Sequence, residues 1–192
     1  LKHEKTGKLY KGVISKGFYS KETNQFYDFT IDNELIRPLL KGGEIGRYNK
    51  PTSNNYIIYP YKITGDKQEL LELETIQQKD EVVYEYLLQN EELLRSREKN
   101  KFDKKDWYTY SRNQNIAQMP RPKILTQVLA KKSTLTIDKD AKYCFVGGGT
   151  AGGYGLILKE GLKLEQILPI LNSKLLQWFL QKYASPFSGG YY

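Results

Sequence analysis

The sequence predicts an α+β domain, built from a mixed or antiparallel curved sheet and two main helices. Two observations lead to this class. Short strand-like segments recur at mixed spacing along the chain, and two longer stretches carry apolar residues on one helical face. The chain shows no internal repeat and no low-complexity segment. Its 192 residues are enough to bury a core, so we expect residues 1–192 to form one domain.

The first half of the chain is predicted to be mainly extended. Residues 9–15 predict a short strand, and residues 25–31 predict a second one after a polar loop. Residues 54–63 alternate aromatic and β-branched side chains and end near Gly65-Asp66, which favours a third strand.

The clearest helix is predicted over residues 80–99, where apolar residues fall near one face and Glu and Arg near the other. A second helix is predicted over 164–184, with Pro169 near its start because proline lacks a backbone N–H. Between the helices the sequence predicts a buried strand at 123–130, a hairpin arm over 133–146 and another strand at 154–158.

Composition indicates a globular, basic chain. Hydrophobic residues make up 39% and aromatic residues 13% of the sequence, which excludes a disordered chain. The formal charge of +8 predicts a polyanionic partner, although solvated lysines would give the same number. The 16 tyrosines add to the prediction, since a tyrosine offers a flat face to a base and a hydroxyl to a phosphate.

Several classes of protein are excluded. The single cysteine, Cys144, rules out a disulfide framework and multi-cysteine zinc sites, and the single histidine, His3, rules out most histidine-based catalysis. No apolar run approaches the length of a membrane span, and the start has neither a signal peptide nor an initiator Met. We therefore expect a fragment of a longer cytoplasmic protein.

The glycine-rich stretch CFVGGGTAGGYG is the most tempting cofactor motif. Gly147, Gly149 and Gly152 satisfy G-x-G-x-x-G, and Phe145 would complete the F-x-G-x-G loop of S-adenosylmethionine enzymes. A dinucleotide loop has to open a helix whose N-terminal amides hold the pyrophosphate. Residues 154–158 favour a strand instead, so we expect a glycine-rich hairpin turn and no cofactor in this chain.

No catalytic or metal-binding set is predicted. Cys144 lies in an apolar strand without a histidine to activate it, which indicates a core residue. The carboxylates Glu69, Glu72 and Glu74 are interpreted as a solvated face. The Asn-Pro-Pro-aromatic motif of adenine methyltransferases is absent from these residues. We expect this chain to be non-catalytic.

The stretch WYTYSRNQN (107–115) is predicted to recognise nucleic acid. Arginine pairs bidentately with guanine, while asparagine and glutamine do the same with adenine. Arg112, Asn113 and Gln114 are therefore candidate base readers, and Tyr108 and Tyr110 are further candidate DNA contacts. The alternative is an ordinary loop whose aromatic residues cover the edge of a core, as we expect at least for Trp107.

A second candidate surface is RPLLKGGEIGRYNKP (37–51), which places four cations around two adjacent glycines and a tyrosine. Lys41, Arg47 and Tyr48 are candidate DNA contacts here, and Lys174 on the last helix is another. The alternatives are internal salt bridges of Arg37 and Arg47 that orient the segment, and an ordinary solvated position for Lys174.

The order of these segments resembles a known family. The segments KGVISKG…FYDF, RPLLKGGEIGRY, YIIYPY, a helix ending LLRSRE, WYTYSR, PKILTQ and LPILNSKLLQWFL…SGG follow one another as in the TaqI-like C-terminal specificity domain. This is the target-recognition domain of adenine-N6 DNA methyltransferases and of fused restriction–modification enzymes. The most specific pieces are residues 37–42 with Ile45 and Arg47-Tyr48, and residues 171–176.

The resemblance implies sequence-specific recognition of double-stranded DNA. The methyltransferase domain would precede this chain, bind S-adenosylmethionine and hold the flipped adenine, and a fused nuclease would add Mg²⁺. Lys41, Arg47 and Lys174 would meet phosphates, and Arg112, Asn113 and Gln114 would read bases. A type I restriction specificity subunit and a basic protein-interaction module are the alternatives.

Overall fold

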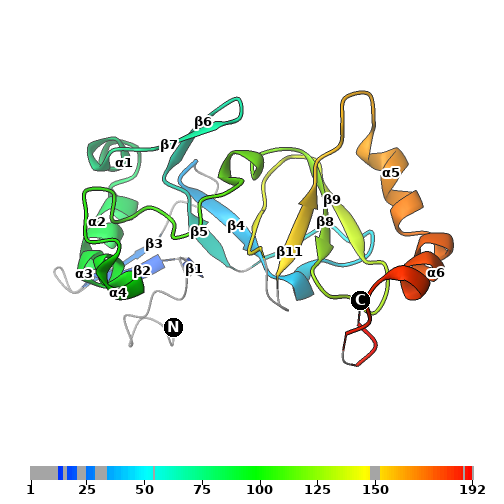
Figure 1. Cartoon of the computed structure of the whole chain (residues 1–192). Coiled ribbons are helices and arrows are strands. Elements are labelled where there is room, and N and C mark those ends of the chain that lie inside the picture. The colour runs from blue at the N-terminus through cyan, green and yellow to red at the C-terminus, as the bar shows by residue number, and fades with distance from the viewer. Residues whose placement is uncertain are drawn as a thin grey trace. The chain divides into compact units, whose positions relative to one another are not determined.

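The computed structural model describes residues 13–14, 17–20, 25–28, 34–53, 55–147, 152–187 and 189–191. The chain divides into two compact units (Figure 1). Unit 1 comprises residues 1–37 and 55–118, and unit 2 comprises residues 38–54 and 119–192. Both units mix short strands with helices, which confirms the α+β class. The extent of the domain, predicted as residues 1–192, stays a prediction.

The strands of unit 1 form antiparallel pairs. β1 (Val13–Ile14) pairs with β5 (Tyr56–Ile58), β2 (Gly17–Ser20) with β3 (Gln25–Asp28), and β6 (Tyr61–Thr64) with β7 (Lys67–Leu70). The other residues of the predicted strands 9–15 and 25–31 lie outside the described part of the chain. The predicted strand 54–63 is interrupted at Tyr59-Pro60, and its second half turns back at Gly65-Asp66 to form the β6–β7 hairpin. Gly65 has a φ of 62°, a conformation that glycine adopts without steric cost.

The predicted helix 80–99 is three short helices, and another precedes it. They are α1 (Leu73–Lys79), α2 (Glu81–Gln89), α3 (Glu91–Arg95) and α4 (Arg97–Asn100). Asp80 caps α2, because its carboxylate accepts from the Val83 N–H at 3.1 Å. The single long helix was wrong because polar side chains bind the backbone at the breaks. Asn90 Nδ2 donates to the Tyr86 carbonyl and Ser96 Oγ to the Leu93 carbonyl.

The core of unit 1 forms where these helices meet the strands. Ile76 of α1 and Val83 of α2 are completely buried, and Trp107 is 2% exposed. The remaining buried members of the cluster are Leu35, Ile36, Ile58, Leu87 and Tyr108. The segment that begins at Trp107 is therefore fixed to the core at its first two residues.

Unit 2 is built on a three-stranded antiparallel sheet. β8 (Lys123–Gln127) lies between β11 (Gly153–Leu156) and β9 (Leu135–Asp138). The predicted buried strand at 123–130 and the strand after the glycine-rich stretch are confirmed. The predicted hairpin arm 133–146 has different partners: β9 pairs with β8, while β10 (Cys144–Phe145) pairs in parallel with Leu39 and Leu40 of β4 (Ile36–Leu40).

Two glycines of β11 make room for the core of unit 2. A Cβ on Gly153 would lie 2.9 Å from Ile45 Cδ1, and a Cβ on Gly155 would lie 2.9 Å from Phe145 Cε1. Glycine is needed here because side chains approach the strand closely. Residues 148–151 of the glycine-rich stretch lie outside the described part of the chain, but the residues that follow form a strand and open no helix.

The predicted helix 164–184 is divided into α5 (Leu164–Leu171) and α6 (Lys174–Tyr183). Ser173 caps α6, since its hydroxyl accepts from the Leu176 N–H at 3.1 Å. Pro169 lies inside α5, not near its start. α5 runs alongside β9 (Figure 1), and its Leu164 and Leu168 pack in a cluster with Ile124 and Leu135. Within the described residues, no helix is long and apolar enough to cross a membrane.

A buried ion pair joins β8 to β9. Lys123 Nζ lies 2.5 Å from Asp138 Oδ2, and the two side chains are 1% and 2% exposed. The ammonium also donates to the carbonyls of Met119 and Arg121, and the carboxylate accepts from the N–H groups of Lys142 and Tyr143. The hydrogen-bonding capacity of both ions is thus widely used, as burial of a charge requires.

We expect Asp138→Ala to lower the free energy of unfolding by about 3–5 kcal/mol, because it strands a buried ammonium. Urea denaturation followed by circular dichroism measures this. Glu165→Ala is the matched control, since it removes the exposed partner of Lys139 and should leave the midpoint almost unchanged. Equal effects of the two substitutions would contradict a special contribution of the buried Lys123–Asp138 pair to stability.

Candidate nucleic-acid interface

The candidate base readers lie on an exposed loop of unit 1, residues 111–115 (hereafter loop 111–115). All five residues are exposed. The side chains of Arg112, Asn113 and Gln114 make no hydrogen bond or ion pair with the described residues of the chain. Three polar side chains that guanine or adenine edges would bind are thus free for a ligand.

The backbone before this loop is fixed to the core. Tyr108 is 7% exposed, and its hydroxyl donates to the Leu71 carbonyl at 2.6 Å. Tyr110 donates its hydroxyl to the Ile58 carbonyl. Arg97 donates to the carbonyls of Trp107 and Thr109 at 2.6 and 3.0 Å. The ring of Tyr108 therefore packs in the core, and its contact with DNA stays a prediction.

The backbone within and after the loop is held as well. The Gln68 side chain of β7 donates to the Asn113 carbonyl at 2.7 Å and accepts from the Ala117 N–H at 3.2 Å. The buried hydroxyl of Tyr59 donates to the Ile116 carbonyl at 2.6 Å, in the short 3₁₀ helix η2 (Ile116–Gln118). Loop 111–115 is thus a short exposed segment with anchors on both sides.

Burial tunes the phenols below the loop. It raises the pKa of Tyr108 to about 12, with Glu72, Glu74 and Asp106 adding to the effect. Burial also raises the pKa of Tyr61, whose hydroxyl accepts from the Tyr110 N–H at 2.7 Å. Both phenols remain neutral at physiological pH, so Tyr108 keeps its hydrogen bond to the Leu71 carbonyl and Tyr61 keeps the one from the Tyr110 N–H.

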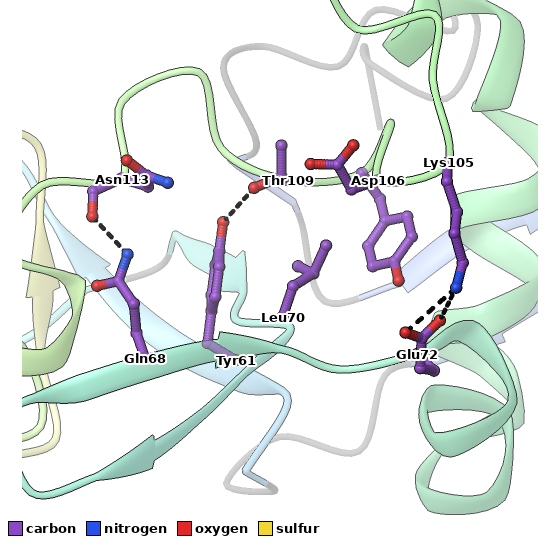
Figure 2. A pocket seen from close by; sticks show the side chains of 9 residues that line it. Tyr61, Gln68, Leu70, Glu72, Lys105, Asp106, Thr109 and Asn113 are labelled. Carbon is purple, nitrogen blue, oxygen red and sulfur yellow. Dashed lines mark hydrogen bonds and ion pairs between the residues drawn. The ribbon is translucent and has the colours of Figure 1, made fainter.

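A pocket of about 280 Å³ opens beside loop 111–115 in unit 1. Figure 2 shows its lining, with Gln68 reaching Asn113, Tyr61 reaching Thr109 and Lys105 paired with Glu72. The other lining residues are Leu70, Asp106 and Tyr108. Among the described residues, no group of three His, Cys, Asp or Glu side chains is placed to hold a metal ion.

The predicted phosphate contacts of residues 41–50 lie in unit 2, in a segment that its own sheet holds in place. Gln127 of β8 donates to the Ile45 carbonyl at 2.8 Å, and Tyr143 donates to the Pro51 carbonyl. Thr136 of β9 donates to the Asn49 carbonyl. The segment 41–51 (hereafter the basic segment) is therefore fixed through its backbone, while Lys41, Arg47, Tyr48 and Lys50 are exposed.

Arg47 and Tyr48 are joined to the break between α5 and α6. The Arg47 guanidinium donates to the Asn172 carbonyl at 2.5 Å and lies 5.3 Å from the centre of the Tyr48 ring. Tyr48 has a φ of 60°, and its N–H donates to the Leu135 carbonyl at 3.0 Å. Arg47 thus has the orienting role that the sequence left open, through a carbonyl and not through a salt bridge.

Asn172 itself is 1% exposed and binds the backbone of β9. Its Oδ1 accepts from the Leu135 N–H at 3.0 Å, and its Nδ2 donates to the Leu135 carbonyl at 2.9 Å. The amide thereby bonds β9 much as a neighbouring strand would. It also places Lys174, the exposed first residue of α6, two positions further along the chain.

Lys41 and Lys174 keep exposed side chains that make no hydrogen bond or ion pair within the described part of the chain. Lys41 begins the 3₁₀ helix η1 (Gly42–Glu44), where its N–H donates to Glu44 Oε2 at 2.7 Å. Lys174 starts a helix whose exposed surface is largely apolar, with Leu175 at 74%, Trp178 at 53% and Tyr183 at 71% exposure. Arg37, by contrast, lies over the Tyr59 ring in unit 1.

The comparison with known proteins bears on both segments. Residues 37–192 match the TaqI-like C-terminal specificity domain. The chain belongs to this family. Its resemblance to the family, predicted from the order of its segments, is thereby confirmed.

One relative extends this finding. The specificity domain is 25% identical over 194 aligned positions to the type II restriction enzyme and methyltransferase RM.Eco57I of Escherichia coli. The alignment covers 94% of this chain and 19% of the relative. The chain thus spans about a fifth of that relative's length, and family membership supports a role in DNA recognition.

The anchors of both segments were not predicted from the sequence. Gln68, Gln127 and Asn172 act through neutral amides on backbone groups that are 45, 82 and 37 residues away in the chain. No local pattern marks such a residue. Of these three anchors only Asn172 could have been singled out from the sequence, because it lies inside the family-like stretch 171–176. The sequence did not indicate what its side chain binds.

We expect Asn172→Ala to destabilise the specificity domain by about 1–3 kcal/mol, because the buried Leu135 N–H loses its acceptor. Thermal and urea unfolding measure this. Asn49→Ala, at an exposed asparagine, is the control and should change the free energy of unfolding far less. Equal losses would show that Asn172 carries no special weight.

Tyr108 gives a prediction for alkaline pH. Its folded pKa of about 12 lies above the ordinary value of 10, so its contribution to stability is complete below pH 10 and is lost as the pH rises toward 12. We expect the urea midpoint to fall less steeply above pH 10 in Tyr108→Phe than in the unsubstituted chain. Tyr61 and Tyr86 are present in both proteins, so their own titration cancels in the comparison. If the urea midpoints of the two proteins fell in parallel above pH 10, the raised pKa of Tyr108 would be contradicted.

Proposed function

We propose that this specificity domain recognises a particular sequence of double-stranded DNA on behalf of an adenine-N6 DNA methyltransferase. The observation that carries the proposal is loop 111–115, which presents Arg112, Asn113 and Gln114 to solvent on a backbone anchored at both ends. Family membership supports the same conclusion. The domain itself carries out no reaction in this proposal.

Base reading follows from the chemistry of the three side chains. Arg112 can donate two parallel hydrogen bonds to the O6 and N7 atoms of a guanine, and Asn113 or Gln114 can pair with N6 and N7 of an adenine. A loop that is ordered before DNA binds loses little conformational entropy when it enters a groove. The anchors below it therefore favour discrimination between base pairs.

Affinity that does not depend on sequence would come from the exposed cations. Lys41 and Lys174 have free ammonium groups, and Arg47 retains further N–H donors beside the one on the Asn172 carbonyl. Each phosphate that such a cation neutralises releases counterions, so this part of the affinity falls with salt. The formal charge of +8 is in keeping with such a surface.

The reaction would take place in a different part of the longer protein. A methyltransferase portion would bind S-adenosylmethionine, hold the adenine taken out of the duplex, and be the partner of this domain in the cytoplasm. The E. coli relative is named as both a restriction enzyme and a methyltransferase. By analogy a fused nuclease that uses Mg²⁺ is part of the proposal.

The decisive experiment is selection of duplexes from a random pool by this 192-residue chain at two salt concentrations. We expect a short motif to be enriched and to survive the higher salt. Retention that is lost with salt and enriches no motif would remove sequence reading from this chain. Absence of retention at low salt would overturn DNA binding and favour a protein-interaction module.

A type I specificity subunit is the related alternative, and the form of the selected motif separates the two. Such a subunit carries a second recognition domain, and this chain would then supply one half of a divided site. A continuous motif that is also the methylation site of the longer protein supports the present proposal.

Arg112→Ala tests the reader assignment. We expect it to cost about 1–3 kcal/mol of binding to the selected motif and to relax the preference at one base pair. Lys41→Ala is the control, which should weaken binding to all duplexes alike and reduce the salt slope by about one. Competition binding with each single-base variant of the motif measures both effects. An unchanged preference in Arg112→Ala would refute the assignment.

A further inference from the structure

We infer that Gln68 is a positioning residue for DNA reading, which holds loop 111–115 in the conformation that selects the base sequence. This inference rests on the proposed function. Gln68 does not need to touch DNA for this role. It acts through the backbone of the loop that carries Arg112, Asn113 and Gln114.

The geometry places one amide on both sides of a short segment. Gln68 Nε2 donates to the Asn113 carbonyl at 2.7 Å, and Oε1 of the same side chain accepts from the Ala117 N–H at 3.2 Å. Figure 2 shows the side chain extending from β7 to Asn113. The three residues between these two contacts include Asn115, which has a φ of 63°. The two contacts thus bracket the backbone that has to adopt an uncommon conformation.

An amide is required for this arrangement. Glutamine offers a donor and an acceptor on one planar group, whereas glutamate offers only acceptors and lysine only donors. Asparagine has the same group on a side chain that is one methylene shorter. The strand below is itself fixed, since Gln68 pairs with Ile63 across the β6–β7 hairpin. The amide therefore transfers the position of a rigid hairpin to the loop.

The remaining anchors make the role of Gln68 separable from folding. The Tyr59 hydroxyl holds the Ile116 carbonyl, and Gln118 Nε2 donates to Asp66 Oδ1 at 3.0 Å. Loop 111–115 is exposed, so water can take over the Asn113 carbonyl if Gln68 is replaced. Loss of Gln68 should thus loosen the tip of the loop while its base stays attached.

A looser loop 111–115 would affect base recognition and phosphate binding differently. Hydrogen bonds to base edges depend on angle and distance, so a mobile loop loses discrimination. Attraction between cations and phosphates depends mainly on charge, which a neutral substitution leaves unchanged. Gln68 should therefore affect the ratio of specific to non-specific binding and leave the salt dependence alone.

The test uses Gln68→Met, which keeps the length of the side chain and removes both hydrogen bonds. Gln78→Met is the matched control, because Gln78 is an exposed glutamine of α1 in the same unit. Both proteins are assayed against the selected motif and against duplexes that lack it. We expect Gln68→Met to lower the specificity ratio about tenfold, the order of one base contact, and Gln78→Met to leave it unchanged.

A double-mutant cycle excludes a general effect. In a background that carries Arg112→Ala and Gln114→Ala, Gln68→Met should cause no further loss of the ratio, since most of the side chains that it positions are gone. Amide exchange adds a direct readout: exchange at the Ala117 N–H should accelerate in Gln68→Met while the core amides keep their protection. If Gln68→Met fails to fold, Gln68→Asn, which keeps a neutral amide on a side chain that is one methylene shorter, takes its place.

The outcomes separate the two proposals. If the unsubstituted chain prefers a motif and Gln68→Met keeps the full ratio, the positioning role is overturned and the proposed function stands. A loss of the ratio that persists in the double-substituted background also overturns the positioning role. If the unsubstituted chain shows no preference for any duplex, the proposed function itself fails.

Discussion

The hydrogen bonds of Asn172 hold together the parts of unit 2 that carry the proposed phosphate contacts. The side-chain amide occupies both backbone groups of Leu135, while the Asn172 carbonyl accepts the Arg47 guanidinium. The Leu135 carbonyl in turn also accepts the N–H of Tyr48. One buried residue thus fixes β9, the break between α5 and α6, and the end of the basic segment. Arg47 and Tyr48 of the first family-like stretch and Asn172 of the stretch 171–176 thus belong to one hydrogen-bonded arrangement.

Hydrogen bonds from mostly neutral side chains hold loop 111–115 and the basic segment in place. Most of the exposed cations of these segments are therefore not needed as anchors. Gln68 and Tyr59 hold the backbone around loop 111–115, and Gln127 and Tyr143 hold the basic segment. Had ion pairs done this work, phosphate groups and salt would compete with the anchors. With neutral donors the conformation of each segment does not depend on ionic strength, whereas the proposed affinity of its cations for DNA would depend on it. The exceptions are Arg97, whose guanidinium holds the Trp107 and Thr109 carbonyls before loop 111–115, and Arg47, which combines an anchoring bond with exposure.

The sequence predicted the fold class, the strands with long apolar runs, and the family, but not the breaks in the helices. β8 and β11 were predictable because short runs of aliphatic, aromatic and β-branched residues near turn-forming residues favour a strand. The helices 80–99 and 164–184 were predicted too long because periodicity reports only which face is apolar. Asn90, Ser96 and Ser173 end or restart helices through side-chain contacts that a periodic pattern does not register. The candidate readers were predictable from their type, whereas Gln68 was not, because its partners are 45 and 49 residues away.

Several of the abundant tyrosines have a structural role. Their abundance was taken to favour stacking on bases, yet several described ones bury their rings and use the hydroxyl on a carbonyl. Tyr59, Tyr108, Tyr110 and Tyr143 donate to the carbonyls of Ile116, Leu71, Ile58 and Pro51. A phenol suits this task because its ring supplies apolar area to the core while its hydroxyl reaches a loop that has no strand partner. Since burial keeps the pKa of Tyr108 near 12, its donor stays protonated across the physiological range. In the proposed function Tyr59, Tyr108 and Tyr110 would contribute to recognition indirectly, because they fix the backbone on both sides of the candidate readers.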